Sequence, residues 1–311
     1  MFAVNDYERH VWQQLLKAKA QPPSLATRLS QTLTGRVRRL LEVAQCAPDS
    51  PLGTLLTRIQ SVAREVIIHT LERSATAHQY ARVESTLRTF GSQATSASEI
   101  RLLPLQIKDA AARRLAQEGT VTVAAQGALA GLTASLCELI PGLQALTVAT
   151  ILADMAASIY LLAQNAVRIG YSYGYSVDEP EDLPHFLVAM APHTRDAALI
   201  EAKLMAYTAL RESGGKLAAS VAGHASVRLL AAENPAVGRL LDAVVARLAL
   251  RLSERQWGLL IPVAGAAVQG AVNAGFARAG SIEAVRYFQH LHLLDRYGEA
   301  YMTRQSPPMS A

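Results

Sequence analysis

The sequence is almost free of charge between residues 119 and 167. This stretch contains no lysine or arginine, and its only acidic side chains are Glu138 and Asp154. Surface helices of soluble proteins normally carry charged residues on the side that faces water. The missing charge therefore indicates either a very apolar core or contact with a lipid bilayer.

The chain is also poor in aromatic residues and cysteines. Aromatics make up 5% of its 311 residues, whereas alanine, leucine and arginine are abundant. This composition is typical of closely packed helices and disfavours β-sheets, so we predict an all-α multi-helix bundle. Cys46 and Cys137 form no CxxC pair, which argues against a disulfide framework or a zinc site and fits a reducing cytoplasm.

Motifs of the common enzyme classes are missing as well. The sequence contains no HExxH, no Walker GxxxxGK[ST] and no GxSxG, and its histidines lack the spacing of metal ligands. We therefore expect no enzyme activity, no cofactor and no metal, and we assign no catalytic residue.

Positive charge is concentrated in the N-terminal third. Residues 1–118 contain 16 Lys and Arg against 10 Asp and Glu, within a net charge of +5 for the whole chain. Such a bias suits an anionic membrane surface, and without a reader motif nucleic acid is the weaker option. No signal peptide is visible. We expect a cytoplasmic protein, peripheral at the inner face of the cytoplasmic membrane.

The chain divides into three predicted regions. These are basic amphipathic helices in residues 1–90, a helical core in 91–303 and a disordered tail in 304–311. The first helix, residues 7–19, has an apolar side that includes Val11, Trp12 and Leu15. That helix suits docking on the core or lying on a membrane surface.

The uncharged stretch predicts a central helical hairpin, because Pro141-Gly142 divides residues 119–167 into two arms. Each arm has about the 20 residues that cross a hydrocarbon core, but an acid near the bilayer centre costs about 2.5–3.5 kcal/mol. As a transmembrane pair the hairpin is marginal. Glu138 and Asp154 are candidate buried acids, which must be protonated, paired or exposed through a cavity.

A second glycine-rich apolar helix is predicted at residues 258–280, near the C-terminus. Small residues at helical spacing permit close helix approach, so we expect this helix to pack on the first arm of the hairpin. Ser281 is expected to cap a final amphipathic helix. We predict packing or membrane-inserting roles for Gly127, Gly131, Pro141, Pro262, Gly265, Gly270 and Asn273.

A cluster of tyrosines follows the hairpin. Tyr171, Tyr173 and Tyr175 suit either an interfacial belt or packing at a loop. The four acids between residues 178 and 182 indicate a solvated turn rather than paired catalytic carboxylates.

Landmarks along residues 7–297 resemble the bacterial EcsC family. Three of them are Tyr7-Glu8 opening a helix that Pro22-Pro23 closes, a glycine-rich arm leading to Ile140-Pro141, and Tyr173-Gly174-Tyr175 before an acidic loop. The ending matches best, with Ile261-Pro262-Val263-Ala264-Gly265 followed by Gly270, Asn273, Ala284 and Tyr287-Phe288. The resemblance implies a membrane-associated helical protein without an established enzyme activity, and an ABC transporter as a partner.

The sequence leaves three functions open. The leading hypothesis is a non-enzymatic membrane-associated helical protein, accessory to a transporter or secretion system as the resemblance implies. The alternative is a soluble helical protein that binds an acyl chain or another apolar ligand. The third is an effector that inserts its hairpin into a target membrane.

Overall fold

The structure, a computed structural model, describes residues 4–20, 51–74, 77–138, 144–191, 201–206, 208–209, 227–257 and 265–298. Most of these residues are helical, and none of them forms a β-strand. The predicted all-α class is confirmed.

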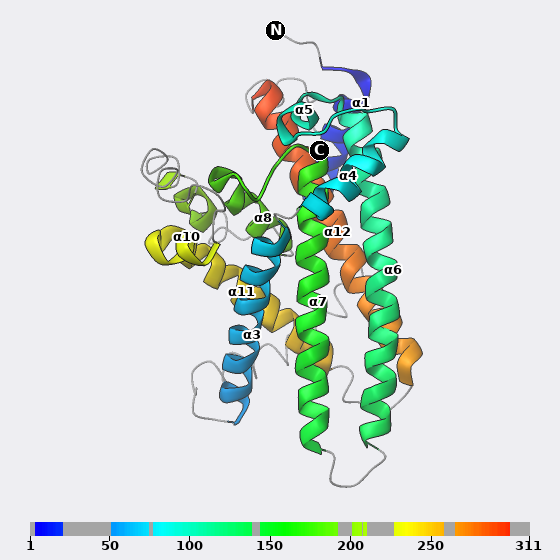
Figure 1. The fold of residues 1–311 in the computed structure, drawn as a ribbon, viewed down its shortest axis with the longest axis vertical. Helices are drawn as coiled ribbons and strands as arrows, with labels where there is room; N and C mark the ends of the chain where they lie inside the picture. The colour runs from blue at the N-terminus through cyan, green and yellow to red at the C-terminus, as the bar shows by residue number, and fades with distance from the viewer. Residues whose placement is uncertain are drawn as a thin grey trace.

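Three long helices, α6, α7 and α12, form the centre of the molecule (Figure 1). The elements in chain order are α1 (Asp6–Ala20), α3 (Pro51–Ser74), α4 (Ala77–Thr89), α5 (Ala97–Leu102), α6 (Leu105–Glu138), α7 (Gln144–Ser172), the 3-10 helix η1 (Pro180–Asp182), α8 (Leu183–Met190), α10 (Val227–Glu233), α11 (Pro235–Trp257) and α12 (Gly265–Tyr297).

The predicted helical hairpin is present as α6 and α7, which pack side by side in opposite directions (Figure 1). α12 runs diagonally behind both and packs most extensively on α6, whereas residues 258–264 of the predicted glycine-rich helix lie outside the described residues. α12 also contains the final amphipathic segment, because one helix continues from residue 265 to 297. Ser281 is therefore buried inside α12, and its prediction as an N-cap is wrong.

Two glycines let α6, α7 and α12 approach closely at one height of the bundle. The Asn165 side chain occupies the space where a β-carbon on Gly119 would lie, and it donates a 3.4 Å hydrogen bond to Ser281 Oγ. A β-carbon on Gly280 would lie 2.6 Å from Leu162. A β-carbon at either position would displace the neighbouring side chain, so these contacts show which residues of the three helices share one height.

The tyrosines after α7 are core residues. Tyr171, Tyr173 and Tyr175 are all 4% exposed or less. The rings of Tyr173 and Tyr175 lie 6.0 and 5.3 Å from that of Phe288, centroid to centroid. The packing interpretation is therefore confirmed, and the interfacial belt is wrong for these tyrosines.

The turn that follows is built around a positive φ and a buried acid. Gly174 has a φ of +89°, and a β-carbon there would lie 2.6 Å from the carbonyl oxygen of Ala97. Asp182 is buried and accepts hydrogen bonds from the Ser176 N–H at 3.0 Å and the Arg101 guanidinium at 2.9 Å. The prediction of a solvated acidic turn fits the three exposed acids but is wrong for Asp182.

The remaining helices surround the central three. α3 packs along α7, α11 packs on α3, and α4 lies across α6 and α7. α1 docks at the upper end through Val11, Trp12 and Leu15, which are buried in the main core, so the docking alternative holds for this helix. Residues of α1, α3, α7, α11 and α12 share this core, so helices of the predicted regions 1–90 and 91–303 pack together.

Candidate functional site

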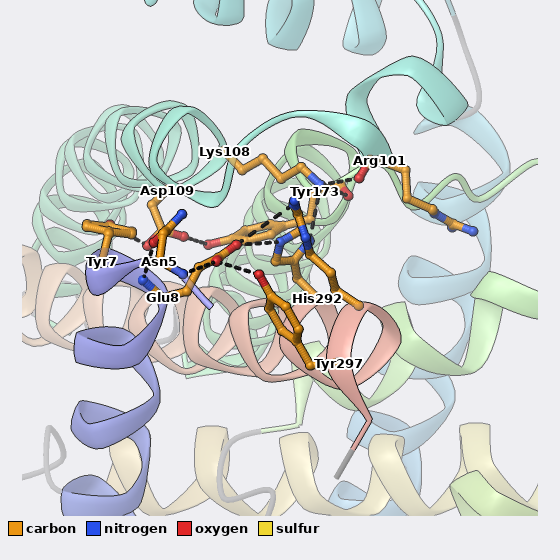
Figure 2. A network of polar contacts seen from close by, with 10 residues as sticks. Asn5, Tyr7, Glu8, Arg101, Lys108, Asp109, Tyr173, His292 and Tyr297 are labelled. Carbon is orange, nitrogen blue, oxygen red and sulfur yellow. Dashed lines mark hydrogen bonds and ion pairs between the residues drawn. The ribbon is translucent and has the colours of Figure 1, made fainter. Parts of the chain in front are cut away.

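Two adjacent ionisable residues at the start of α6 are completely buried. Lys108 is 0% exposed and Asp109 is 1% exposed. Figure 2 shows them in a network that joins α6 to α1, α12 and the segment around Tyr173. A buried charge is costly unless it is paired and hydrogen-bonded. The partners therefore decide whether this is a reactive site or a structural one.

Lys108 has an acceptor for each of the three N–H donors of its ammonium group. Its Nζ donates to the carbonyl oxygens of Arg101 at 2.7 Å and Tyr173 at 3.4 Å, and lies 3.2 Å from Nδ1 of His292. Burial, together with nearby arginines, lowers the pKa of Lys108 to about 7. Three acceptors match the charged form, and in that form the nitrogen has no lone pair to offer a substrate.

Asp109 is satisfied by three donors from three parts of the chain. The hydroxyls of Tyr7 and Tyr173 donate at 2.6 and 2.5 Å, and the amide of Gln289 donates at 2.7 Å. Arg113 lies 3.8 Å away. Burial raises the pKa of Asp109, and these hydrogen bonds oppose that rise because they stabilise the carboxylate. Both oxygens are occupied, so Asp109 is placed to hold helices together.

Glu8 ties α1 into the same network. The Glu8 backbone N–H donates to Asn5 Oδ1 at 2.8 Å, and the Asn5 N–H donates to Glu8 Oε2 at 3.2 Å, a reciprocal pair that caps the N-terminus of α1. Tyr297 also donates to Oε2, at 2.7 Å. One side chain thus starts α1 and anchors it on α12.

An incompletely satisfied contact lies between Glu8 and His292. Glu8 Oε1 and His292 Nε2 are buried and lie 3.9 Å apart, and neither has a hydrogen-bond partner among the described residues, although the Arg296 guanidinium lies 3.8 Å from Glu8 Oε1. Because Lys108 donates to Nδ1, the imidazole proton lies on Nε2 and faces Glu8. Burial and the charges of Lys108 and Arg296 lower the pKa of His292 to about 3, so the imidazole is neutral at pH 7.

The network brings together segments that are far apart in the sequence. Tyr7-Glu8, Tyr173-Gly174-Tyr175 and Tyr287-Phe288, on which the EcsC resemblance rests, all lie in the network or in the aromatic packing beside it. Sequence reasoning missed Lys108, Asp109 and His292. The available signal was the spacing of Lys108 with Leu105, Ala112 and Leu115, which places a lysine on the apolar stripe of its helix.

The residues predicted from the sequence lie elsewhere. Asp154 is on α7 and is 5% exposed, so it faces protein. Pro141 and Pro262 lie outside the described residues. The others lie on helices for which the structure describes the backbone but not these side chains: Gly127, Gly131 and Glu138 on α6, and Gly265, Gly270 and Asn273 on α12.

The half of α6 that contains these glycines is a second candidate site. α1 and α4 contact residues 105–118, the upper half, as in the bonds from Tyr7 to Asp109 and from Arg82 to Glu118. The lower half, residues 119–138, is about 30 Å long and runs beside α7, and α12 crosses behind it (Figure 1). Val121, at its start, is 69% exposed. Because no residue from 119 to 137 is charged, any outward side of this half is uncharged.

Neither candidate site contains a recognisable metal centre. Among the described residues, no three His, Cys, Asp or Glu side chains are grouped so that they would hold a metal ion. Within the same ranges, no helix combines the length and the apolar character that crossing a membrane requires.

Comparisons with known proteins found no match to any protein-family model, curated protein or solved structure. The resemblance to the EcsC family therefore stays a prediction, and the function has to be argued from the chain itself.

Proposed function

We propose that this is a non-enzymatic helical protein that associates with membranes through the lower halves of α6, α7 and α12. The observation that carries the proposal is the uncharged lower half of α6. A helix side that faces water normally carries charged residues, and the upper half of the same helix does, since Arg113 and Arg114 are more than half exposed. The lower half replaces such residues with Ala, Gly, Leu, Val and Thr.

Partial burial of the lower halves in lipid fits the placement of Asp154, the acid within α7. Asp154 faces protein rather than the outside of the bundle, so it adds no cost of moving a carboxylate into hydrocarbon. Small residues pack the central helices closely without large side chains. The network around Lys108 and Asp109 fixes the opposite end of the same helices. The resemblance adds a role as accessory to a transporter or secretion system, with a membrane protein such as an ABC transporter as a partner.

The test is sedimentation of the purified full chain with phospholipid vesicles, after fractionation of a detergent-free lysate. We expect the wild type to pellet with vesicles and Val121→Asp to bind about tenfold more weakly, because a carboxylate would enter the interface. Leu102→Asp is the matched control. It replaces an exposed apolar residue on α5, close to the network, and should bind like the wild type.

A wild type that stays in the supernatant at low salt contradicts the proposal. An apolar ligand that co-purifies with such a protein would favour the alternative of a soluble acyl-chain binder. Release of a trapped dye from vesicles would instead favour the membrane-inserting effector.

A further inference from the structure

We propose that Arg82, Arg114 and Arg168 form a surface that binds the phosphate groups of anionic phospholipids. We call these three residues the border arginines, because they lie where the charged half of the central helices ends. This inference rests on the proposed membrane association and identifies the lipid class and the residues that recognise it.

The border arginines surround a single carboxylate. Glu118, the last charged residue before the uncharged half of α6, lies 2.7 Å from Arg82 on α4 and 3.5 Å from Arg114 on α6. Arg168 on α7 is near enough for Arg82 to lower its pKa and for Glu118 to oppose that shift. Arg82 and Arg114 share the Glu118 carboxylate, two positive charges against one negative, and the net positive charge of this group suits an anion.

Their height on the bundle matches the edge of the uncharged segment. Glu118 directly precedes Gly119, and Arg168 lies three residues above Asn165, which fills the space beside Gly119. On α12, the exposed Arg278 lies three residues from Ser281, the partner of Asn165. Three residues of helix rise about 4.5 Å. Arg168 thus lies about one turn above this height and Arg278 about one turn below it, whereas Arg82 and Arg114 reach the border through their contacts with Glu118.

An exposed tyrosine lies on the uncharged side of this border. Tyr160 on α7 is 38% exposed, and its hydroxyl accepts a 2.5 Å hydrogen bond from Gln164. It also acts electrostatically on Arg168, so the two residues are close. Along α7, the order of arginine, tyrosine and then uncharged helix is the order in which a membrane surface presents phosphate, interface and hydrocarbon.

The experiment compares binding to neutral phosphatidylcholine vesicles with binding to vesicles that also contain phosphatidylglycerol. Arg82→Gln with Arg114→Gln should weaken binding to the anionic vesicles roughly 25-fold, at about fivefold for each arginine near an anionic surface. Arg9→Gln with Arg228→Gln is the matched control, since each of these half-exposed arginines is also paired with one acid. The control should lose less than twofold.

A second variant is expected to bind more tightly than the wild type, a result that misfolding could not produce. Glu118→Gln removes the carboxylate that Arg82 and Arg114 share, so it should bind anionic vesicles about fivefold more tightly and neutral vesicles as the wild type does. A wild type that binds both vesicles equally, or a control that loses as much as the border variant, overturns this surface but leaves membrane association standing. A wild type that binds neither overturns both proposals.

Discussion

The two halves of α6 differ in the kind of side chain with which they pack on the rest of the protein. The upper half, residues 105–118, has five charged residues, and two of them, Lys108 and Asp109, are completely buried. The lower half, residues 119–138, has one, Glu138, at its last position. Both halves belong to one continuous helix. The difference therefore reflects what each half contacts rather than a change of secondary structure.

The difference between the two halves shows which contacts determine how the helices are placed against one another. At the upper end, every buried charge on α6 finds partners from other elements, and a misplaced helix would leave those charges unpaired at high cost. Further along the hairpin, at the level of Gly119 and Gly280, fit depends on the absence of side chains, because the neighbours fill the space of a β-carbon. The upper end fixes the register, and the uncharged lower end is the part that would meet a bilayer in the membrane association proposed above.

The largest effect is expected when the upper network loses its central carboxylate. Asp109→Ala leaves the buried donors of Tyr7, Tyr173 and Gln289 without their acceptor. We expect the free energy of unfolding in urea to fall by about 3–5 kcal/mol. Asp242→Ala, which removes an exposed ion pair with Arg64, should cost less than about 1 kcal/mol. Equal losses of unfolding free energy in the two variants would contradict the conclusion that the buried network holds the helices together.

A smaller effect is expected at the glycines, and its sign should differ between sites. In Gly170→Ala the new methyl group would overlap the ring of Phe186 and lie 2.7 Å from that of Phe288, both fully buried. Thermal unfolding should show a loss of about 1–3 kcal/mol. Gly275 on α12 has no atom within 4 Å of a β-carbon, so Gly275→Ala should stabilise the helix by about 0.5–1 kcal/mol. Destabilisation by both would mean that the uncharged half is packed as tightly as the upper core.

Much of the fold could be predicted because patterns of neighbouring residues in the sequence determine it. Missing charge, small residues and a Pro-Gly break define the hairpin of α6 and α7, and Gly-rich spacing finds α12. The same patterns misjudged Ser281, since a serine before an amphipathic run looks like an N-cap. Its true role depends on Asn165, which lies 116 residues away.

The network around Lys108 and Asp109 could not be predicted in the same way, because its hydrogen-bond partners are far away in the sequence. A lysine and an aspartate in sequence usually indicate a solvated helix side, and the sequence does not show that Tyr173 and Gln289 meet Asp109. Asp182 is similar, since its burial and its hydrogen bonds from Arg101 and the Ser176 N–H distinguish it from its exposed neighbours.

The smallest effect is a pH dependence that belongs to the upper end. The pKa of His292 is lowered to about 3 in the folded protein, whereas an unfolded histidine titrates near 6.5. Between these values the unfolded chain binds one more proton, so folded stability falls as the pH falls.

His292→Asn keeps an acceptor for Lys108 and removes this titration. Asp182, whose pKa is raised to about 6, acts in the opposite direction but is present in both proteins, so their difference isolates His292. Between pH 7 and 5.5 the wild type should lose about 1 kcal/mol more stability than the variant in urea unfolding. His69→Asn, at an exposed position on α3, should follow the wild type. Parallel curves for wild type and His292→Asn would show that His292 has the same pKa in the folded and unfolded chain, which contradicts the lowered pKa of the buried imidazole.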